Sequence, residues 1–263
     1  MSEDENTGSW VTYEHPLNER LRTLLRLEFL METARTAMER DAIIDSRMAV
    51  EAFIHTFNVL ERGEVRSEVI KELDRLSTET GFMEAQGLWS AAQVQKETDE
   101  CRRLLRRVGE PDAALGQELR EDELLGLITQ RFGVGAGTCN FDLPSYHRWL
   151  ARPYSERSAD MQRWFESFAD LRAAVRFALR LQREAGIFTD EVATGGNWQS
   201  RTPYDSRVSQ MLRLQAPLEN GVIPEISGNR HLVTIRFLRQ PDTRNRPVPA
   251  GEDVHFRLAR CTL

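Results

Sequence analysis

The hydrophobic pattern changes its period once along the chain, near Gly186, and this change constrains the fold more than any other feature. Before it, apolar residues recur every three to four positions, which is the period of a helix that buries one face. After it, short segments alternate apolar and polar residues, as strands with one buried face do. The sequence therefore predicts an α+β fold, with an N-terminal all-α domain followed by a small antiparallel β-domain.

The helical part is predicted to begin at Pro16, because proline suits the first turn of a helix and a leucine stripe follows it. Further helices are expected over residues 41–62, 64–76, 84–108, 121–132, 143–150 and 158–182. The second of these helices is expected to face inward with Ile44, Met48, Phe53, Phe57 and Leu60. The pieces between residues 40 and 108 pack either on each other or on a second copy of the chain.

The clearest strand is His231–Leu238, where Val233, Ile235 and Phe237 lie on one face. Segments beginning at Met211 and Val254 alternate in the same way, and the turns between them are rich in Gly, Asn, Asp and Pro. The acidic residues 1–12 are expected to be a disordered lead-in. The chain then divides into a helical domain over 13–185 and an antiparallel β-domain over 186–263.

The charge is acidic overall and unevenly spread. The chain has 35 Lys and Arg against 41 Asp and Glu, a net charge of −6. Residues 1–147 hold 17 Lys and Arg against 28 Asp and Glu, whereas residues 186–263 hold 10 against 8. An acidic chain lacks the basic footprint of most nucleic-acid binders, although arginine-mediated nucleic-acid binding stays the alternative function.

The sequence favours a cytoplasmic protein that is not inserted in a membrane. No run of 18 apolar residues occurs, and the acidic, polar N-terminus is unlike a secretory signal. Cys101, Cys139 and Cys261 are an odd, scattered set, which favours reduced thiols.

No motif predicts catalysis, a metal or a cofactor. The run Gly133–Cys139 follows a helix and contains no lysine, so it indicates a turn rather than a phosphate loop. Cys139, Asp142 and His147 are the residue types of a cysteine hydrolase, but a cluster of neighbours fits poorly with a site whose members normally meet from distant segments. The five histidines have no metal-binding spacing.

Residues 139–150 stand out instead as a corner with a proline at the helix entry and Asp142 as the expected cap. Its apolar side chains are expected to pack inward: Phe141, Leu143, Trp149 and Leu150. His147 and Arg148 face elsewhere. The corner serves either packing alone or the binding of a peptide with alternating acidic and apolar residues.

Several blocks, in the same order, resemble the ZapD family of bacterial cell-division proteins over nearly the whole chain from Tyr13. They are Glu14-His-Pro-Leu-Asn-Glu-Arg-Leu-Arg-Thr-Leu-Leu-Arg-Leu-Glu-Phe-Leu30, Leu60-Glu-Arg-Gly-Glu-Val-Arg-Ser-Glu-Val-Ile-Lys-Glu-Leu-Asp-Arg75, Leu119-Arg-Glu-Asp122, Phe141-Asp-Leu-Pro-Ser-Tyr-His147, Ile226-Ser-Gly228 and Ile235-Arg-Phe237. Residues 1–7 and 77–119 match least well.

The resemblance implies a non-enzymatic protein that forms a homodimer through its helical domain. It implies binding to the C-terminal tail of FtsZ, the tubulin-like protein of the division ring, so that the dimer cross-links and bundles FtsZ filaments at mid-cell. Position by position, it implies tail-binding roles for Arg26, His147 and Arg236, with Arg120 and Arg66 nearby. It implies no cofactor, nucleic-acid or membrane partner.

Two positions depart from the family pattern. Glu123 and Leu232 stand where some members carry further pocket arginines, so the pocket is expected to be less basic or to recruit Arg230 or Arg239.

Overall fold

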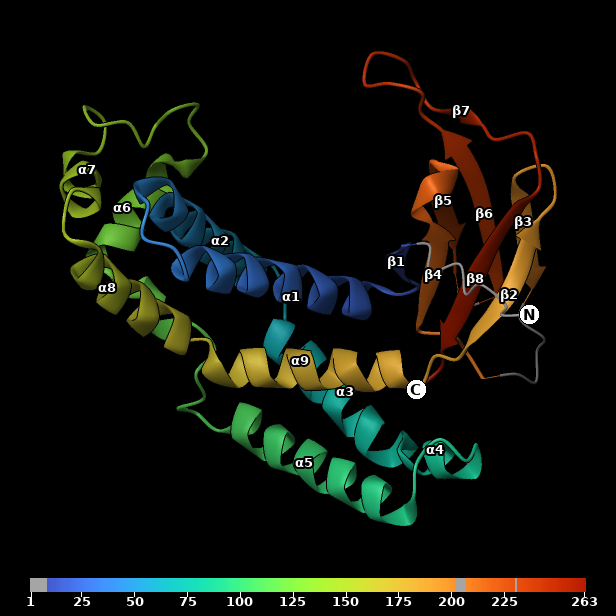
Figure 1. The fold of residues 1–263 in the computed structure, drawn as a ribbon. Coiled ribbons are helices and arrows are strands. Elements are labelled where there is room, and N and C mark those ends of the chain that lie inside the picture. The colour runs from blue at the N-terminus through green and yellow to red at the C-terminus, as the bar shows by residue number, and fades with distance from the viewer. Residues whose placement is uncertain (1–8, 202–206, 230) are drawn as a thin grey trace, which may run out of the picture. The chain divides into compact units, whose positions relative to one another are not determined.

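A computed structural model describes residues 9–201, 207–229 and 231–263, except the side chains of Arg62 and Glu118. The α+β class is confirmed, because helices fill the first part of the chain and antiparallel strands the last (Figure 1). The helices are α1 (Glu19–Met38), α2 (Ile43–Arg62), α3 (Val65–Glu79), α4 (Gly81–Ala85), α5 (Ala91–Gly109), α6 (Glu123–Phe132), α7 (Pro144–Leu150), α8 (Tyr154–Glu166) and α9 (Ala169–Glu184), with the 3₁₀ turns η1 (Gln117–Arg120) and η2 (Leu218–Asn220). The strands are β1 (Trp10–Pro16), β2 (Phe188–Ala193), β3 (Asn197–Arg201), β4 (Met211–Pro217), β5 (Val222–Gly228), β6 (Leu232–Arg239), β7 (Val248–Pro249) and β8 (Val254–Cys261).

The chain forms two compact units, and their boundaries differ from the predicted domains. The helical unit is Thr23–Ala178, and the β unit combines Met1–Arg22 with Leu179–Leu263. The chain therefore passes from one unit to the other inside α1 and again inside α9. The helical unit is an insertion between two parts of the β unit.

The first described element is a strand, so the predicted helix start at Pro16 is wrong. β1 pairs antiparallel with β4, from Trp10 opposite Pro217 to Pro16 opposite Met211. The helix begins later, where the Asn18 side chain accepts the backbone N–H of Leu21 at 2.9 Å as a cap. The disordered lead-in is also wrong for residues 10–12, which belong to β1. Residues 1–8 of the predicted lead-in lie outside the described residues.

Two four-stranded sheets build the β unit. One has the order β1-β4-β8-β2, and the other has the order β3-β6-β5 with β7 paired to β6. Their inner faces meet in one core, where the rings of Phe237 and Phe256 lie 5.1 Å apart. The predicted inward face of β6 is confirmed, because Val233, Ile235 and Phe237 are all buried there.

The helical unit has its largest aromatic cluster between α2 and α8. Phe53 of α2 contacts Trp164 and Phe165 of α8 and Phe168 just after it, with ring centroids 6.2 to 6.4 Å apart. The prediction that Phe53 of α2 faces inward is therefore confirmed. The same prediction is wrong at Ile44 and Met48, whose side chains are 62% and 43% exposed.

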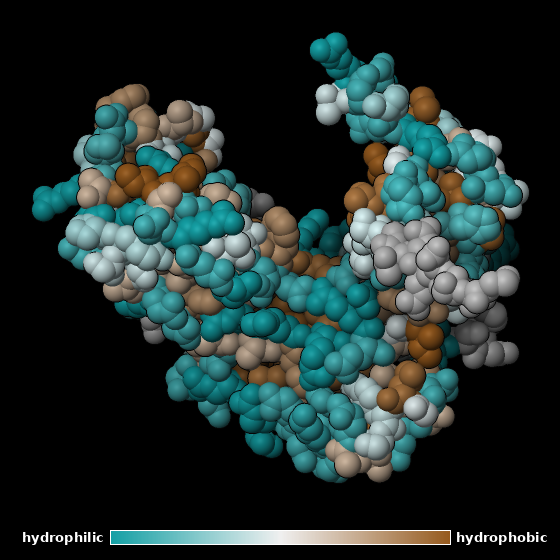
Figure 2. Space-filling model, viewed as in Figure 1, coloured by the Kyte–Doolittle hydropathy of each residue, from teal (hydrophilic) through white to brown (hydrophobic). Residues whose placement is uncertain are grey.

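The helices α3 and α5 pack side by side as a hairpin (Figure 1). Their contact face buries Val69 and Leu73 of α3 against Cys101 and Leu104 of α5. The opposite face of α5 is covered by charged side chains, and hydrophilic colour dominates it in Figure 2. Of the two arrangements left open for residues 40–108, the structure therefore shows α3 and α5 packed on each other.

Candidate functional site

Arg236 lies on the outer face of the β3-β6-β5 sheet. Because side chains alternate along a strand, burying Ile235 and Phe237 leaves Arg236 outside. Its guanidinium lies 3.5 Å from the carboxylate of Glu225 on β5, and the Arg236 side chain is 53% exposed. An exposed ion pair of this kind contributes little stability, so Arg236 is available to another carboxylate.

The other arginines considered for this face differ in their availability. Arg239 donates to the carbonyl of Asn220 at 2.5 Å and also to the carboxylate of Glu252, so it ties two loops together. Arg230 lies outside the described residues. Leu232 is half-buried on β6.

Arg26 and His147 are exposed on α1 and α7 of the helical unit. Pro144 occupies the first position of α7, as proline prefers, while Tyr146, Trp149 and Leu150 are buried beneath the helix. His147 is left on the solvent side. Among the described residues no ion pair or side-chain hydrogen bond joins Arg26 to His147.

Two expectations for this corner are wrong. The helix cap is Leu143 without a side-chain hydrogen bond, and the Asp142 carboxylate instead lies 3.3 Å from the Sγ of Cys139. Phe141 is 81% exposed rather than packed inward.

Arg120 ends η1 and lies at the edge of an apolar cavity. The cavity, of about 320 Å³, lies among α2, η1 and α6. It is lined by Phe53, Ile54, Phe57, Glu61, Leu119, Arg120, Leu125, Gly126 and Thr129. The guanidinium of Arg120 lies 5.8 Å from the ring centre of Phe57 and 3.7 Å from the carboxylate of Glu61.

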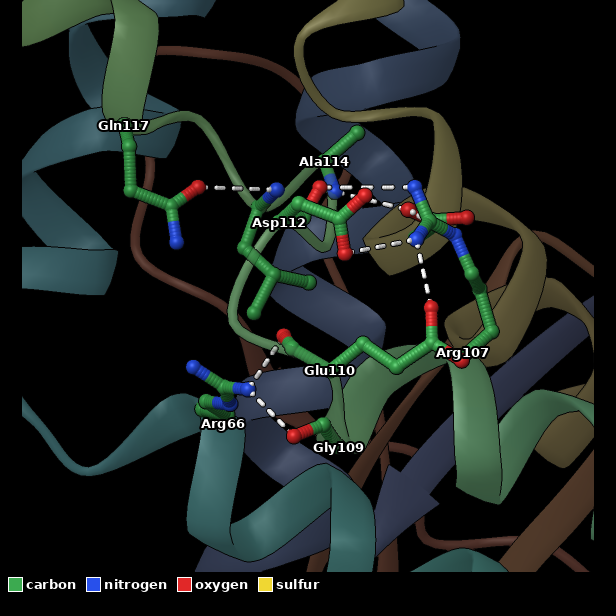
Figure 3. Close-up of polar contacts among 9 residues, drawn as sticks. Arg66, Arg107, Gly109, Glu110, Asp112, Ala114 and Gln117 are labelled. Carbon is green, nitrogen blue, oxygen red and sulfur yellow. Dashed lines mark hydrogen bonds and ion pairs between the residues drawn. The ribbon is translucent and has the colours of Figure 1, made fainter.

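Arg66 holds the C-terminal end of α5 (Figure 3). Its Nη2 donates to the carbonyls of Gly109 and Glu110 at 2.8 and 2.6 Å, where the helix leaves its last carbonyls unpaired and the helix dipole is negative. Arg107 reinforces this end through ion pairs with Glu110 and Asp112 at 2.8 and 3.1 Å. Arg66 therefore has a structural role.

A second cavity brings Arg66 and Arg120 together. It has a volume of about 220 Å³, and both arginines line it with Phe57, Leu60 and Leu115 among others. Phe57 and Arg120 belong to both cavities, so the two cavities are neighbours. Of the five predicted site residues, Arg66 and Arg120 are the two that line the same cavity.

The structure gives no assembled catalytic or metal centre in the part of the chain that it describes. No group of three or more His, Cys, Asp or Glu side chains is positioned there to hold a metal ion. Burial raises the pKa of the Cys101 and Cys261 thiols to about 12, which keeps both protonated and weakly reactive. Across the described helices, none combines the length and apolar character needed to cross a membrane.

The cavity among α2, η1 and α6 was missed from sequence. Its apolar residues look like ordinary core positions, since Phe53 and Leu125 follow the helical period. One signal was present: Gly126 interrupts the middle of a helix, where glycine is unfavourable without a local reason.

Comparisons with known proteins identify the family of this chain. A profile of the ZapD family, described as a cell division protein, matches residues 25–236. A cell division protein ZapD from Methylococcus capsulatus is 34% identical over 253 residues, which cover 96% of this chain and 98% of the relative. The same name belongs to a protein from Azoarcus sp. that is 34% identical, covering 96% of this chain and 100% of the relative. A further ZapD, from Serratia proteamaculans, is 35% identical, covering 95% and 97%. The chain belongs to the ZapD family of cell division proteins.

Proposed function

We propose that this protein is a non-enzymatic cell-division factor that binds the C-terminal tail of FtsZ in the cytoplasm at mid-cell. As a homodimer it cross-links FtsZ filaments into bundles and so stabilises the division ring. The observation that carries this proposal is family membership over nearly the full length of the chain. The relatives' names give a role in cell division, and the tail, the dimer and the bundling are the proposed steps.

The proposed tail site uses Arg26, His147 and Arg236, with lesser roles for Arg120 and Arg66. Arginine suits an acidic peptide because its planar fork donates paired hydrogen bonds to a carboxylate. Arg26, Arg120 and Arg236 support the proposal by their exposure. Arg66 supports it less, because its Nη2 already holds the end of α5.

Weak single contacts suit such a cross-linker. A disordered tail loses conformational entropy when it binds, so one tail on one site binds modestly. A dimer carries two sites on one body, and the second tail then binds at a high effective concentration. Filament bundling therefore depends on the dimer more strongly than the capture of one tail does.

The surface of α2 offers a place for the second copy. Ile43 and Ile44 are 50% and 62% exposed, and Met48 lies one turn further along with 43% of its surface exposed. Apolar side chains grouped on one helix face commonly mark an interface. We place the self-association surface of the homodimer on this face.

The first experiment titrates a fluorescent FtsZ C-terminal tail peptide with wild-type protein and with Arg236→Ala. We expect about tenfold weaker binding, because a charge-assisted hydrogen bond is lost. Circular dichroism and thermal melting should stay unchanged, since Arg236 is exposed.

Arg257→Ala is the matched control. Arg257 lies on β8 opposite Asp190 of β2 and pairs with it at 3.1 Å, so it is also an exposed cross-strand arginine. Its replacement should leave tail affinity unchanged. Equal affinity of Arg236→Ala and wild type would remove Arg236 from the site. Tight, strongly salt-dependent binding to duplex DNA, without tail binding, would favour the nucleic-acid alternative instead.

A further inference from the structure

The outer face of the β3-β6-β5 sheet carries a second arginine besides Arg236. Because side chains alternate along a strand, the core residues of β6 and the half-buried Trp198 of β3 face inward and leave the residues between them outside. The described residues of this outer face are Asn197, Gln199 and Arg201 of β3, Ile223, Glu225 and Ser227 of β5, and Leu232, Thr234, Arg236 and Leu238 of β6. Two of them are arginines and one is acidic, so the face is positively charged on a chain that is acidic overall.

The strand register fixes where the two arginines lie. Arg201 is the cross-strand partner of Leu232, and Arg236 lies four residues further along β6 (Figure 1). Each residue of a strand advances the chain by about 3.4 Å, so the backbone positions of the two arginines are separated by about 13 Å along the direction of β6.

The row of side chains between the two arginines is neutral and polar. It consists of Ser227, Thr234 and Gln199, which lie opposite one another on the three strands. Hydroxyl and amide groups of this kind can donate hydrogen bonds to the carbonyls of a peptide laid over the sheet. Among the described residues of these strands, no carboxylate lies between the two cations.

The two guanidinium groups differ in what they contact. Arg236 has the carboxylate of Glu225 at 3.5 Å, whereas Arg201 is exposed and forms no ion pair or side-chain hydrogen bond with another described residue. The donors of Arg201 are therefore available to a ligand. Their planar arrangement suits a carboxylate.

We infer that Arg201 is a further binding residue for the FtsZ tail, and that an extended tail segment lies along β6 with one carboxylate on Arg236 and another on Arg201. This inference rests on the proposed function and adds a second anchor at a defined spacing. In an extended peptide, residues i and i+4 point the same way and lie about 13 Å apart, which matches the separation of the two arginines. A small anion would reach one arginine only.

The test measures the affinity of the fluorescent tail peptide by anisotropy for Arg201→Gln. We expect about two- to fivefold weaker binding, because one exposed guanidinium–carboxylate contact is lost. The affinity should also depend less on salt, since one ion pair fewer forms with the peptide. Arg246→Gln is the matched control, because Arg246 is another exposed arginine of the β unit. The same change of net charge there should leave the affinity unchanged.

A second variant moves the guanidinium to the neighbouring strand. In the double variant Arg201→Leu, Leu232→Arg, the cross-strand pair exchanges its two residues, so the net charge and the approximate place of the cation are kept. It should bind the tail more tightly than the single variant Arg201→Leu and within about twofold of wild type. Misfolding does not produce such a recovery.

The outcomes separate the inference from the proposed function. If Arg201→Gln binds the tail like wild type while Arg236→Ala is weakened, Arg201 is not part of the site and the tail-binding proposal stands. A folded exchange variant that recovers no affinity would overturn the placement of the second carboxylate. If the wild-type chain does not bind the tail, both proposals are wrong. Should the exchange variant fail to fold, Arg201→Gln and Arg246→Gln give the decision, and equal affinities of these two overturn the inference.

Discussion

The carboxylate of Glu14 pairs with two arginines of the β unit, Arg183 and Arg213. It accepts hydrogen bonds from Arg183 of α9 at 2.8 and 2.7 Å and from Arg213 of β4 at 3.1 Å. Burial alone would raise the pKa of Glu14, but the hydrogen bonds and charges of Arg183 and Arg213 outweigh it and lower the pKa. The Glu14 carboxylate therefore connects β1 to α9 and to β4, which lie far from it in the sequence.

We predict that Glu14→Gln lowers the free energy of unfolding by about 1–2 kcal/mol at pH 7, because charge-assisted hydrogen bonds are weakened in a partly exposed site. A carboxyl with a lowered folded-state pKa contributes stability above its unfolded pKa and loses that contribution as pH falls through the folded value. The difference between wild type and variant should therefore shrink below about pH 4.5. Urea denaturation at several pH values measures it.

Glu19→Gln is the control, because the Glu19 side chain is 84% exposed and pairs only with Arg22 among the described residues. Its unfolding free energy should match that of wild type within error. A pH-independent deficit in Glu14→Gln would show that packing, not charge, is lost at Glu14.

Single residues were predicted well where the local pattern decides them. Arg236 was expected outside because its strand neighbours are apolar, and the alternation holds. Glu14 begins a block that resembles the family, two residues before the expected helix start at Pro16, and the structure places it on β1. The sequence near Glu14 contains no sign of Arg183 or Arg213, so the ion cluster was not predictable.

At the scale of elements, the periodicity of apolar residues located most helices and the main strands. It failed where tertiary contacts determine the secondary structure. β1 pairs with a strand about two hundred residues away, and Pro16 at its end favoured a helix start instead. The single helix expected over 158–182 is two helices, α8 and α9, separated at Ser167 and Phe168.

This break is stabilised from another segment. The backbone N–H of Gly116 donates to the carbonyl of Ser167 at 2.7 Å, and the N–H of Ala114 donates to the carboxylate of Asp170 at 2.6 Å. Gly116 has a φ of +89°, a conformation that suits glycine. Residues 158–182 contain no proline or glycine, so the sequence gives no signal of this break.

We predict that Gly116→Ala destabilises the protein by about 2–4 kcal/mol, through backbone strain and contact with Phe168. Chemical denaturation measures the loss. Gly109→Ala is the comparison, because its Cβ would meet no atom within 4 Å, and it should be neutral or slightly stabilising. Equal stability of the two variants would contradict the role given to Gly116.

At the scale of the whole molecule, self-association should depend on the exposed face of α2. The double variant Ile44→Glu, Met48→Glu places like charges on that face and should give a monomer by light scattering after gel filtration. It should bind one tail peptide as wild type does but should not sediment bundled FtsZ filaments, because avidity is lost. An intact dimer would move the interface to another surface.

The α+β class and the family could be predicted from the sequence. The insertion of the helical unit, along the chain, between two parts of the β unit could not. Apolar alternation marks β4, β6 and β8 locally, but nothing local assigns residues 10–16 to the same unit. The cavity beside Arg120 escaped prediction for a similar reason, because its walls come from separate helices.

The pairing of β1 with β4 has a consequence for biosynthesis. Trp10 leaves the ribosome long before Pro217, its partner in the register. At about 5–20 residues per second, the first strand waits roughly 10 to 40 s for the second, while the intervening helices are already able to fold. On a polysome, a β4 just emerging from a neighbouring nascent chain is an equivalent partner for that waiting strand, so crowded translation favours strand-swapped misassembly in this protein.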